Sequence, residues 1–110
     1  SFNRIYGSYM NHAIKFDREF ALTKEQFRKI ITSDCFYCGL KPGQAMKNRN
    51  NTGIFFYNGI DRIDNSSGYL YENCVPCCKT CNRAKYKMSS GEFIAWISRV
   101  YTHTKTYDGA

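Results

Sequence analysis

Cys35-Phe-Tyr-Cys38 and Cys78-Lys-Thr-Cys81 are the stretches that decide the fold of this 110-residue chain. Each places two cysteines three positions apart, and 39 residues separate the two pairs. Two such pairs typically clamp distant segments onto one tetrahedral zinc ion. Because four thiolates close the coordination shell and leave no position for water or substrate, the sequence predicts a structural zinc.

A third pair, Cys74 and Cys77, competes with Cys78 and Cys81 for the second half of this site. The residues from 74 to 77 are predicted to form a strand, where side chains three positions apart point to opposite faces. We therefore predict Cys78 and Cys81 as ligands, and Cys74 and Cys77 as small buried residues. Six cysteines also permit three disulfides in a secreted protein, but the paired spacing favours metal in a reducing compartment.

The segment that leads to the second pair predicts a strand, a loop, a strand and a helix. Residues 60–63 and 74–77 are the strands, and residues 64–72 carry the turn-forming residues of the loop. A helix is predicted over residues 79–87. This is the ββα order.

On the N-terminal side of this unit, residues 39–53 are rich in Lys, Asn and Gly and predict an exposed loop. Residues 54–57 predict a strand. The dipeptide Asn58-Gly59 is typical of a tight hairpin turn, but it can equally lead directly into the next strand. Both alternatives stay open from the sequence.

Three flanking helices are predicted from apolar spacing and capping patterns. The first covers residues 3–20, and the second opens at the capping box Thr23 to Gln26 and ends near Ser33. Ser90 is predicted to cap the last. The apolar stripe of that last helix is expected to pack in the core and comprises Phe93, Trp96, Ile97, Val100 and Tyr101.

Together these features resemble the HNH endonucleases of the ββα-metal superfamily. The resemblance covers roughly residues 35–87 and implies an α+β fold with a zinc-stabilised ββα-metal core. We expect a single domain over residues 1–110. It would comprise a helical extension at 1–34, the core at 35–88 and a C-terminal helix at 89–103.

The resemblance also implies site residues. In HNH enzymes the first strand supplies a metal ligand and a histidine general base, and the helix returns a second metal ligand. Asp61 and Asn82 match the two ligands of a catalytic Mg²⁺ or Mn²⁺ ion, and Asn73 matches the asparagine that ties the hairpin loop together. The cysteines that match the structural zinc set are Cys35, Cys38, Cys78 and Cys81.

The departure from the pattern is Arg62, which stands at the position of the general base. Arginine stays protonated and cannot accept a proton at physiological pH. The only histidines, His12 and His103, lie outside the motif and are predicted to be surface or helix-packing residues.

Three outcomes remain open. In the first, water activated through the divalent ion attacks the phosphorus with little side-chain help. In the second, a tyrosine attacks the phosphorus while Arg62 stabilises the charge of the phenolate and of the transition state. In the third, the site binds nucleic acid without catalysis. Tyr86, four residues after Asn82, is the candidate nucleophile, with a packed or DNA-contacting tyrosine as the alternative. Asp64 is either a second metal ligand or an ordinary turn carboxylate.

The net charge of +7, from 16 Lys plus Arg against 9 Asp plus Glu, favours a nucleic-acid partner. The predicted helix after the second cysteine pair concentrates this charge, and Lys79, Arg83 and Lys87 form one stripe that would contact phosphates. The predicted DNA-binding residues are Lys79, Arg83, Lys85 and Lys87. No apolar run approaches the ~18–20 residues that span a membrane, and no signal-peptide pattern is present.

The sequence thus predicts an HNH-like, metal-dependent endonuclease that hydrolyses phosphodiester bonds in DNA, expected to be double-stranded. Its expected location is intracellular: cytoplasmic, nuclear or virus-encoded. One alternative is a zinc-stabilised nucleic-acid-binding module without catalysis. The other is a small zinc or disulfide protein that works through protein contacts. The sequence shows no clear dimer face.

Overall fold

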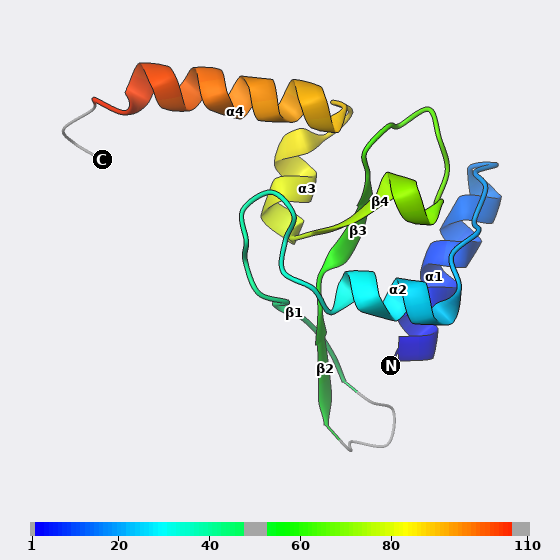
Figure 1. Ribbon diagram of the computed structural model, residues 1–110. Helices are drawn as coiled ribbons and strands as arrows, with labels where there is room; N and C mark the ends of the chain where they lie inside the picture. The colour runs from blue at the N-terminus through cyan, green and yellow to red at the C-terminus, as the bar shows by residue number, and fades with distance from the viewer. Residues whose placement is uncertain (1, 48–52, 107–110) are drawn as a thin grey trace.

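The computed structural model describes residues 2–47 and 53–106, which form a mixed α/β fold (Figure 1). Two small antiparallel sheets and four α-helices make up the described part. The elements in chain order are α1 (Phe2–Lys15), α2 (Lys24–Ile31), β1 (Gln44–Lys47), β2 (Ile54–Tyr57), β3 (Gly59–Arg62), the short 3-10 helix η1 (Tyr71–Asn73), β4 (Cys74–Cys77), α3 (Lys79–Lys85) and α4 (Ser90–Thr104).

The predicted ββα order is confirmed by β3, β4 and α3. β3 and β4 pair antiparallel, with Gly59 opposite Cys77 and Arg62 opposite Cys74. α3 follows directly, but it ends at Lys85 and not at residue 87 as predicted. Tyr86 has a φ angle of 50°, in the left-handed region that a continuing helix does not use.

The predicted loop over residues 39–53 is wrong in part, because residues 44–47 form β1 and pair with β2 as a hairpin. Residues 48–52 of that prediction lie outside the described residues. Asn58 and Gly59 do not make a hairpin turn, since β3 pairs with β4 and not with β2. The buried Asn58 donates its side-chain amide to the carbonyls of Ser33 and Leu40, at 3.0 and 3.2 Å, and so ties β3 to the first cysteine pair.

The core lies where α1 and α2 pack against β3 and β4. α2 begins at the predicted capping box, in which Thr23 and Gln26 satisfy one another's backbone N–H groups. This places the fully buried Phe27 at the centre of an aromatic cluster. The rings around it belong to Phe2, Tyr6, Tyr9 and Phe20.

α1 ends at Lys15, so the prediction of a helix to residue 20 is wrong. Asp17 has a φ angle of 52°, and Phe20 beyond it forms a parallel bridge with Tyr69. This approach requires Gly68, because a Cβ there would lie 2.5 Å from the carbonyl oxygen of Glu19. The chain after α1 is therefore held against the loop that joins β3 to β4.

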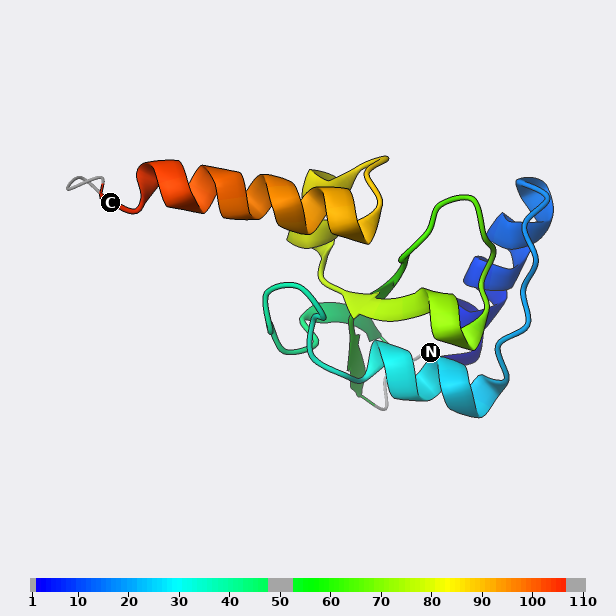
Figure 2. The same ribbon diagram turned by 45° about the horizontal axis from the view of Figure 1, so that its top comes forward.

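α4 also departs from the prediction. Its N-cap is Ser89 and not Ser90, because the capping box needs Glu92 three positions after the cap. Beyond the buried Phe93, α4 extends away from the rest of the described chain (Figures 1 and 2). The predicted packing of its apolar stripe in the core holds for Phe93 and is wrong for the other four residues, since exposure is 41% for Trp96, 40% for Ile97, 41% for Val100 and 66% for Tyr101.

None of the helices in the described ranges combines the length and the apolar character that crossing a membrane requires.

Candidate functional site

The four predicted zinc ligands come together. Cys35 and Cys38 lie in the turn after α2, and Cys78 and Cys81 lie at the start of α3. Their sulfur atoms all lie within 4.8 Å of one another, and the sulfurs of Cys38 and Cys78 are 3.7 Å apart. A tetrahedral ion with metal–sulfur bonds of about 2.3 Å requires sulfurs ~3.8 Å apart. The cluster therefore fits a metal ion such as zinc.

The electrostatics of the cluster favour a cation. Burial raises the pKa of Cys35, but hydrogen bonds from the backbone N–H groups of Cys78, Cys38 and Tyr37 outweigh it and lower that pKa to about 6. Burial and the neighbouring thiol of Cys78 raise the pKa of Cys81. All four sulfurs can become thiolates together only with a cation between them.

The other two cysteines are buried, as predicted. Cys74 is 8% exposed and Cys77 is 1% exposed. Burial raises the pKa of Cys74 to about 12, so it remains a neutral thiol. All six cysteines are free, and none forms a disulfide.

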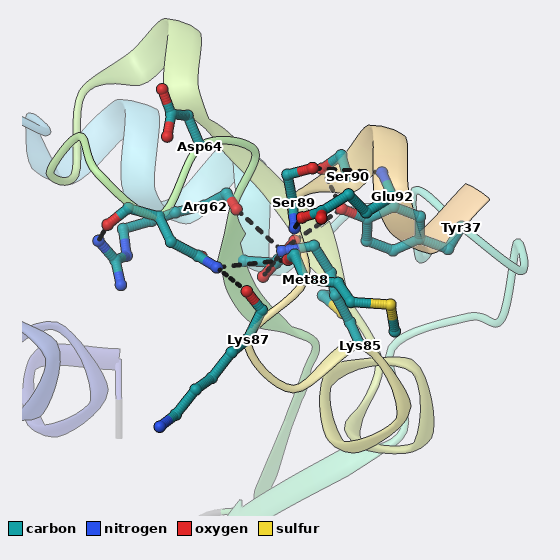
Figure 3. Close-up of polar contacts among 12 residues, drawn as sticks. Tyr37, Arg62, Asp64, Lys85, Lys87, Met88, Ser89, Ser90 and Glu92 are labelled. Atoms are coloured by element: carbon teal, nitrogen blue, oxygen red, sulfur yellow. Dashed lines mark hydrogen bonds and ion pairs between the residues drawn. The ribbon is translucent and has the colours of Figure 1, made fainter. Parts of the chain in front are cut away.

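β3 places its two motif residues on opposite sides of the strand. The carboxylate of Asp61 faces α3, where the ammonium of Lys85 lies 3.1 Å from each of its oxygens. Lys85 also donates to the carbonyl of Arg62 at 3.2 Å, and the hydroxyl of Tyr37 donates to Asp61 at 2.6 Å. Burial and this bond to Asp61 raise the pKa of Tyr37, so the phenol remains a donor. In Figure 3 the side chain of Arg62 extends away from Lys85.

The prediction that Lys85 binds DNA is therefore wrong. Lys85 is 1% exposed, and its ammonium is held by Asp61 and the backbone of β3. A lysine is buried only when a partner compensates its charge. The ion pair fixes α3 to β3.

Replacing Lys85 with methionine should destabilise the protein by about 3–5 kcal/mol, because the carboxylate of Asp61 then stays buried without its counter-ion. The matched control is Lys87→Met, which removes an exposed lysine two positions away. A surface change of this kind costs at most about 0.5 kcal/mol. Urea unfolding of both variants measures the difference, and equal midpoints would show that the ion pair contributes no stability.

The loop between β3 and β4 is organised by two side chains. The amide of Asn73 donates to the carbonyls of Asp64 and Gly68 at 3.1 and 2.9 Å, and its oxygen accepts from the N–H of Asp64 at 2.9 Å. These bonds tie the loop together, and the match of Asn73 to the loop asparagine of HNH enzymes stays a prediction. The second side chain is that of Arg62, the last residue of β3. Its Nη1 donates to the loop carbonyls of Asn65 and Ser67, both at 2.8 Å.

Asp64 has the environment of a turn carboxylate, which is one of its two predicted roles. Its side chain accepts from the hydroxyl and the N–H of Ser66, at 2.7 and 2.9 Å. These bonds lower its pKa, and the charge of Arg62 contributes. Asp64 is exposed to solvent.

A cleft of about 440 Å³ opens between α1, β3 and α3. The predicted site residues Asp61, Arg62, Asn82 and Tyr86 all line it. Sequence reasoning missed the other lining residues, among them the ionisable or aromatic side chains of His12, Arg18 and Tyr69. The guanidinium carbon of Arg62 lies 5.6 Å from the centre of the Tyr69 ring. Of these residues only His12 has a signal in the sequence: it lies one helical turn after Tyr9 and therefore on the same face of α1.

The donor set of the cleft fits a hard divalent ion. Magnesium is typically bound by one or two carboxylates together with water and phosphate oxygens. Asp61 and the amide of Asn82 line the same cleft. Among the described residues Oδ1 of Asp61 accepts only from Lys85, so it keeps a lone pair for an ion. The adjacent ammonium of Lys85 weakens that affinity by repulsion.

The remaining predicted DNA-binding residues are accessible. Lys79 and Arg83 are exposed on α3, and Lys87 is exposed beyond its end. Tyr86 is 76% exposed, and the ammonium of Lys87 lies 5.4 Å from the centre of its ring. Their contact with DNA stays a prediction, as does the role of Tyr86 as nucleophile.

No protein-family model matches the chain. The chain is 37% identical over 102 residues to an uncharacterised protein of Acanthamoeba polyphaga mimivirus. The matched region covers 93% of this chain but only 17% of the viral protein, so the chain spans about a sixth of that relative's length.

Among solved structures, the chain is similar to the rare-cutting HNH restriction endonuclease PacI. The TM-score is 0.66 at 22% sequence identity, and the match covers 96% of this chain and 82% of the endonuclease chain. At this identity the likeness concerns the fold. The chain therefore has an HNH-like α+β fold that carries a four-cysteine cluster able to hold a metal ion.

Proposed function

We propose that this chain is a metal-dependent, HNH-like endonuclease domain that hydrolyses phosphodiester bonds in double-stranded DNA. The observation that carries the proposal is the cleft between α1, β3 and α3. Arg18, Arg62, Asp61 and Asn82 line this cleft. Asp61 is the only carboxylate among its described lining residues and is paired with Lys85, so the positive charges of the two arginines are not neutralised within the cleft. The surplus positive charge suits a phosphate group.

Arg62 would bind and orient the scissile phosphate. Among the described residues, the hydrogen-bond partners of its guanidinium are the carbonyls of Asn65 and Ser67, both through Nη1. The other N–H groups of the fork remain for phosphate oxygens, which match the planar geometry of a guanidinium. Arg62 thereby acts on charge and not on protons.

Asp61 and Asn82 would hold the divalent ion, Mg²⁺ or Mn²⁺. When bound, the ion supplies positive charge beside the phosphate and lowers the pKa of a water molecule. We assign the separate four-cysteine cluster to one structural zinc per chain, held by Cys35, Cys38, Cys78 and Cys81. Its closed thiolate shell leaves it no part in the chemistry.

The test is a plasmid-nicking assay in Mg²⁺ or Mn²⁺ with the wild-type protein and two variants on α3. Asn82→Ala removes a proposed ligand without exposing a buried charge, and it should cleave slowly and recover as the Mn²⁺ concentration rises. Thr80→Ala, an exposed residue of the same helix outside the cleft, is the matched control and should cleave normally. Wild-type protein that binds DNA but never nicks it would favour the non-catalytic binding module.

Affinity for DNA should fall steeply with salt, because binding releases the counter-ions of the phosphates. Replacing both Lys79 and Arg83 with alanine should weaken binding to all sequences and reduce the salt slope by about 0.9 per lost phosphate contact. The control replaces Lys24 and Lys29, two exposed lysines of α2, and changes the net charge equally. Fluorescence anisotropy across a salt series measures both, and equal slopes would exclude α3 as the contact surface.

A further inference from the structure

The HNH motif of this chain lacks a proton acceptor, because Arg62 stands where a histidine is expected. The fold brings a histidine to the same cleft from outside the motif. His12 belongs to α1, and it lines the cleft together with Arg62 and Asn82 although 50 positions separate it from Arg62 in the sequence.

The position of His12 is fixed by the way α1 docks on β3. The hydroxyl of Tyr9 accepts a hydrogen bond of 3.0 Å from the N–H of Ile60, immediately before Asp61 and Arg62. Burial of Ile5 (3% exposed) and Ala13 (fully buried) holds both ends of α1 in the core. His12 lies three residues after Tyr9 and therefore on the same face of the helix. Its ring also packs against Phe16, at 4.6 Å between centroids.

Other described side chains in the cleft are poorly suited to accept a proton. Asp61 is held by Lys85 and Tyr37, and the arginines are always protonated. Burial raises the pKa of Tyr9 to about 12. The charged and titratable groups that share the cleft with His12 are Arg18, Asp61, Arg62, Tyr9, Tyr69 and Tyr86. Imidazole is the side chain that most readily exchanges a proton near neutral pH.

We propose that His12 is the general base of this site, supplied by α1 in place of the missing motif histidine. The inference rests on the proposed nuclease function. His12 accepts a proton from the attacking water as the new bond between water oxygen and phosphorus forms. The bond from phosphorus to the leaving sugar oxygen breaks, and that oxygen takes a proton from solvent. Arg62 stabilises the charge that develops on the phosphate.

The experiment compares His12→Gln with His103→Gln, using cleavage of a duplex oligonucleotide in Mn²⁺. Glutamine keeps hydrogen-bonding capacity and suits a helix but cannot transfer a proton. Because His12 is exposed on α1, its replacement should leave folding, metal content and DNA affinity unchanged. His12→Gln should cleave about 10²–10⁴-fold more slowly. His103, the only other histidine, lies on α4 outside the cleft, and its replacement should have no effect.

The His103→Gln variant also permits a direct test, because His12 is then the only imidazole in the chain. The pH at which the His12 ring titrates by NMR should coincide with the inflection of the cleavage rate. Added imidazole should partly restore His12→Ala. Cleavage by His12→Gln at the wild-type rate, or an inflection unrelated to the ring titration, overturns this inference alone. Absence of cleavage by the wild-type protein overturns the proposed function and the inference together.

Discussion

Replacing Cys78 with serine is expected to unfold the protein at ambient temperature. A structural zinc contributes on the order of 10–16 kcal/mol of apparent binding free energy, and a whole domain of this kind is stable by roughly 5–15 kcal/mol. Cys78 is also the N-cap of α3, where its sulfur accepts from the N–H of Cys81 at 3.4 Å. Its loss should therefore release α3 from the turn after α2. Calorimetric melting and elemental analysis measure the effect, and a chelator should reproduce it in the wild-type protein.

The matched control for this change is Cys74→Ser, which alters a buried cysteine outside the cluster. A buried hydroxyl without a good partner costs about 1–3 kcal/mol. Cys74→Ser should therefore keep its zinc and melt as a folded protein. Equal melting temperatures for the two variants, or purified wild-type protein without zinc, would contradict a structural metal at this cluster.

Replacing Arg62 with alanine is expected to reduce the cleavage rate by about 10²–10³-fold while zinc content is kept. This is the typical cost of removing one charged donor aimed at the transition state. The variant also loses the two hydrogen bonds to the carbonyls of Asn65 and Ser67, so the loop must be checked separately. Single-turnover cleavage with saturating protein separates the rate of the chemical step from DNA affinity.

Two further variants separate the causes. Arg62→Lys keeps the charge but cannot form the planar fork, so it should recover little of the rate. Arg99→Ala removes the same charge from an exposed position on α4, outside the cleft, and should cleave normally. If Arg99→Ala were as slow as Arg62→Ala, net charge and not the position of Arg62 would explain the loss.

The parts of the fold that could be predicted are those with short-range causes. The capping box at Thr23, the order of β3, β4 and α3, and the cysteine cluster follow from spacing of a few residues and from the preference of thiolates for zinc. The start of α4 could have been placed correctly too. Ser89 is the serine that stands three residues before Glu92, and the capping box depends on that spacing.

The parts that could not be predicted depend on contacts between distant segments. Lysine is usually exposed, and the burial of Lys85 follows only from the position of Asp61 across the ββα unit. His12 reaches the cleft through the docking of α1 on β3, which depends on the hydrogen bond of the Tyr9 hydroxyl and on the burial of Ile5 and Ala13. The apolar stripe of α4 has the pattern of a core helix, and no local signal reveals that the described chain leaves it uncovered.

The projection of α4 also decides what an optical signal from this protein reports. Trp96 is the only tryptophan in the chain, and it stacks on Phe93 where α4 leaves the body, at 6.3 Å between ring centroids. A helix of about 12–15 residues is only marginally stable in water without tertiary contacts, so the outer turns of α4 can open while the core around Phe27 remains intact. Tryptophan emission therefore follows the local melting of α4, whereas a probe of Tyr6 or Tyr9, whose rings pack against Phe27, follows the core.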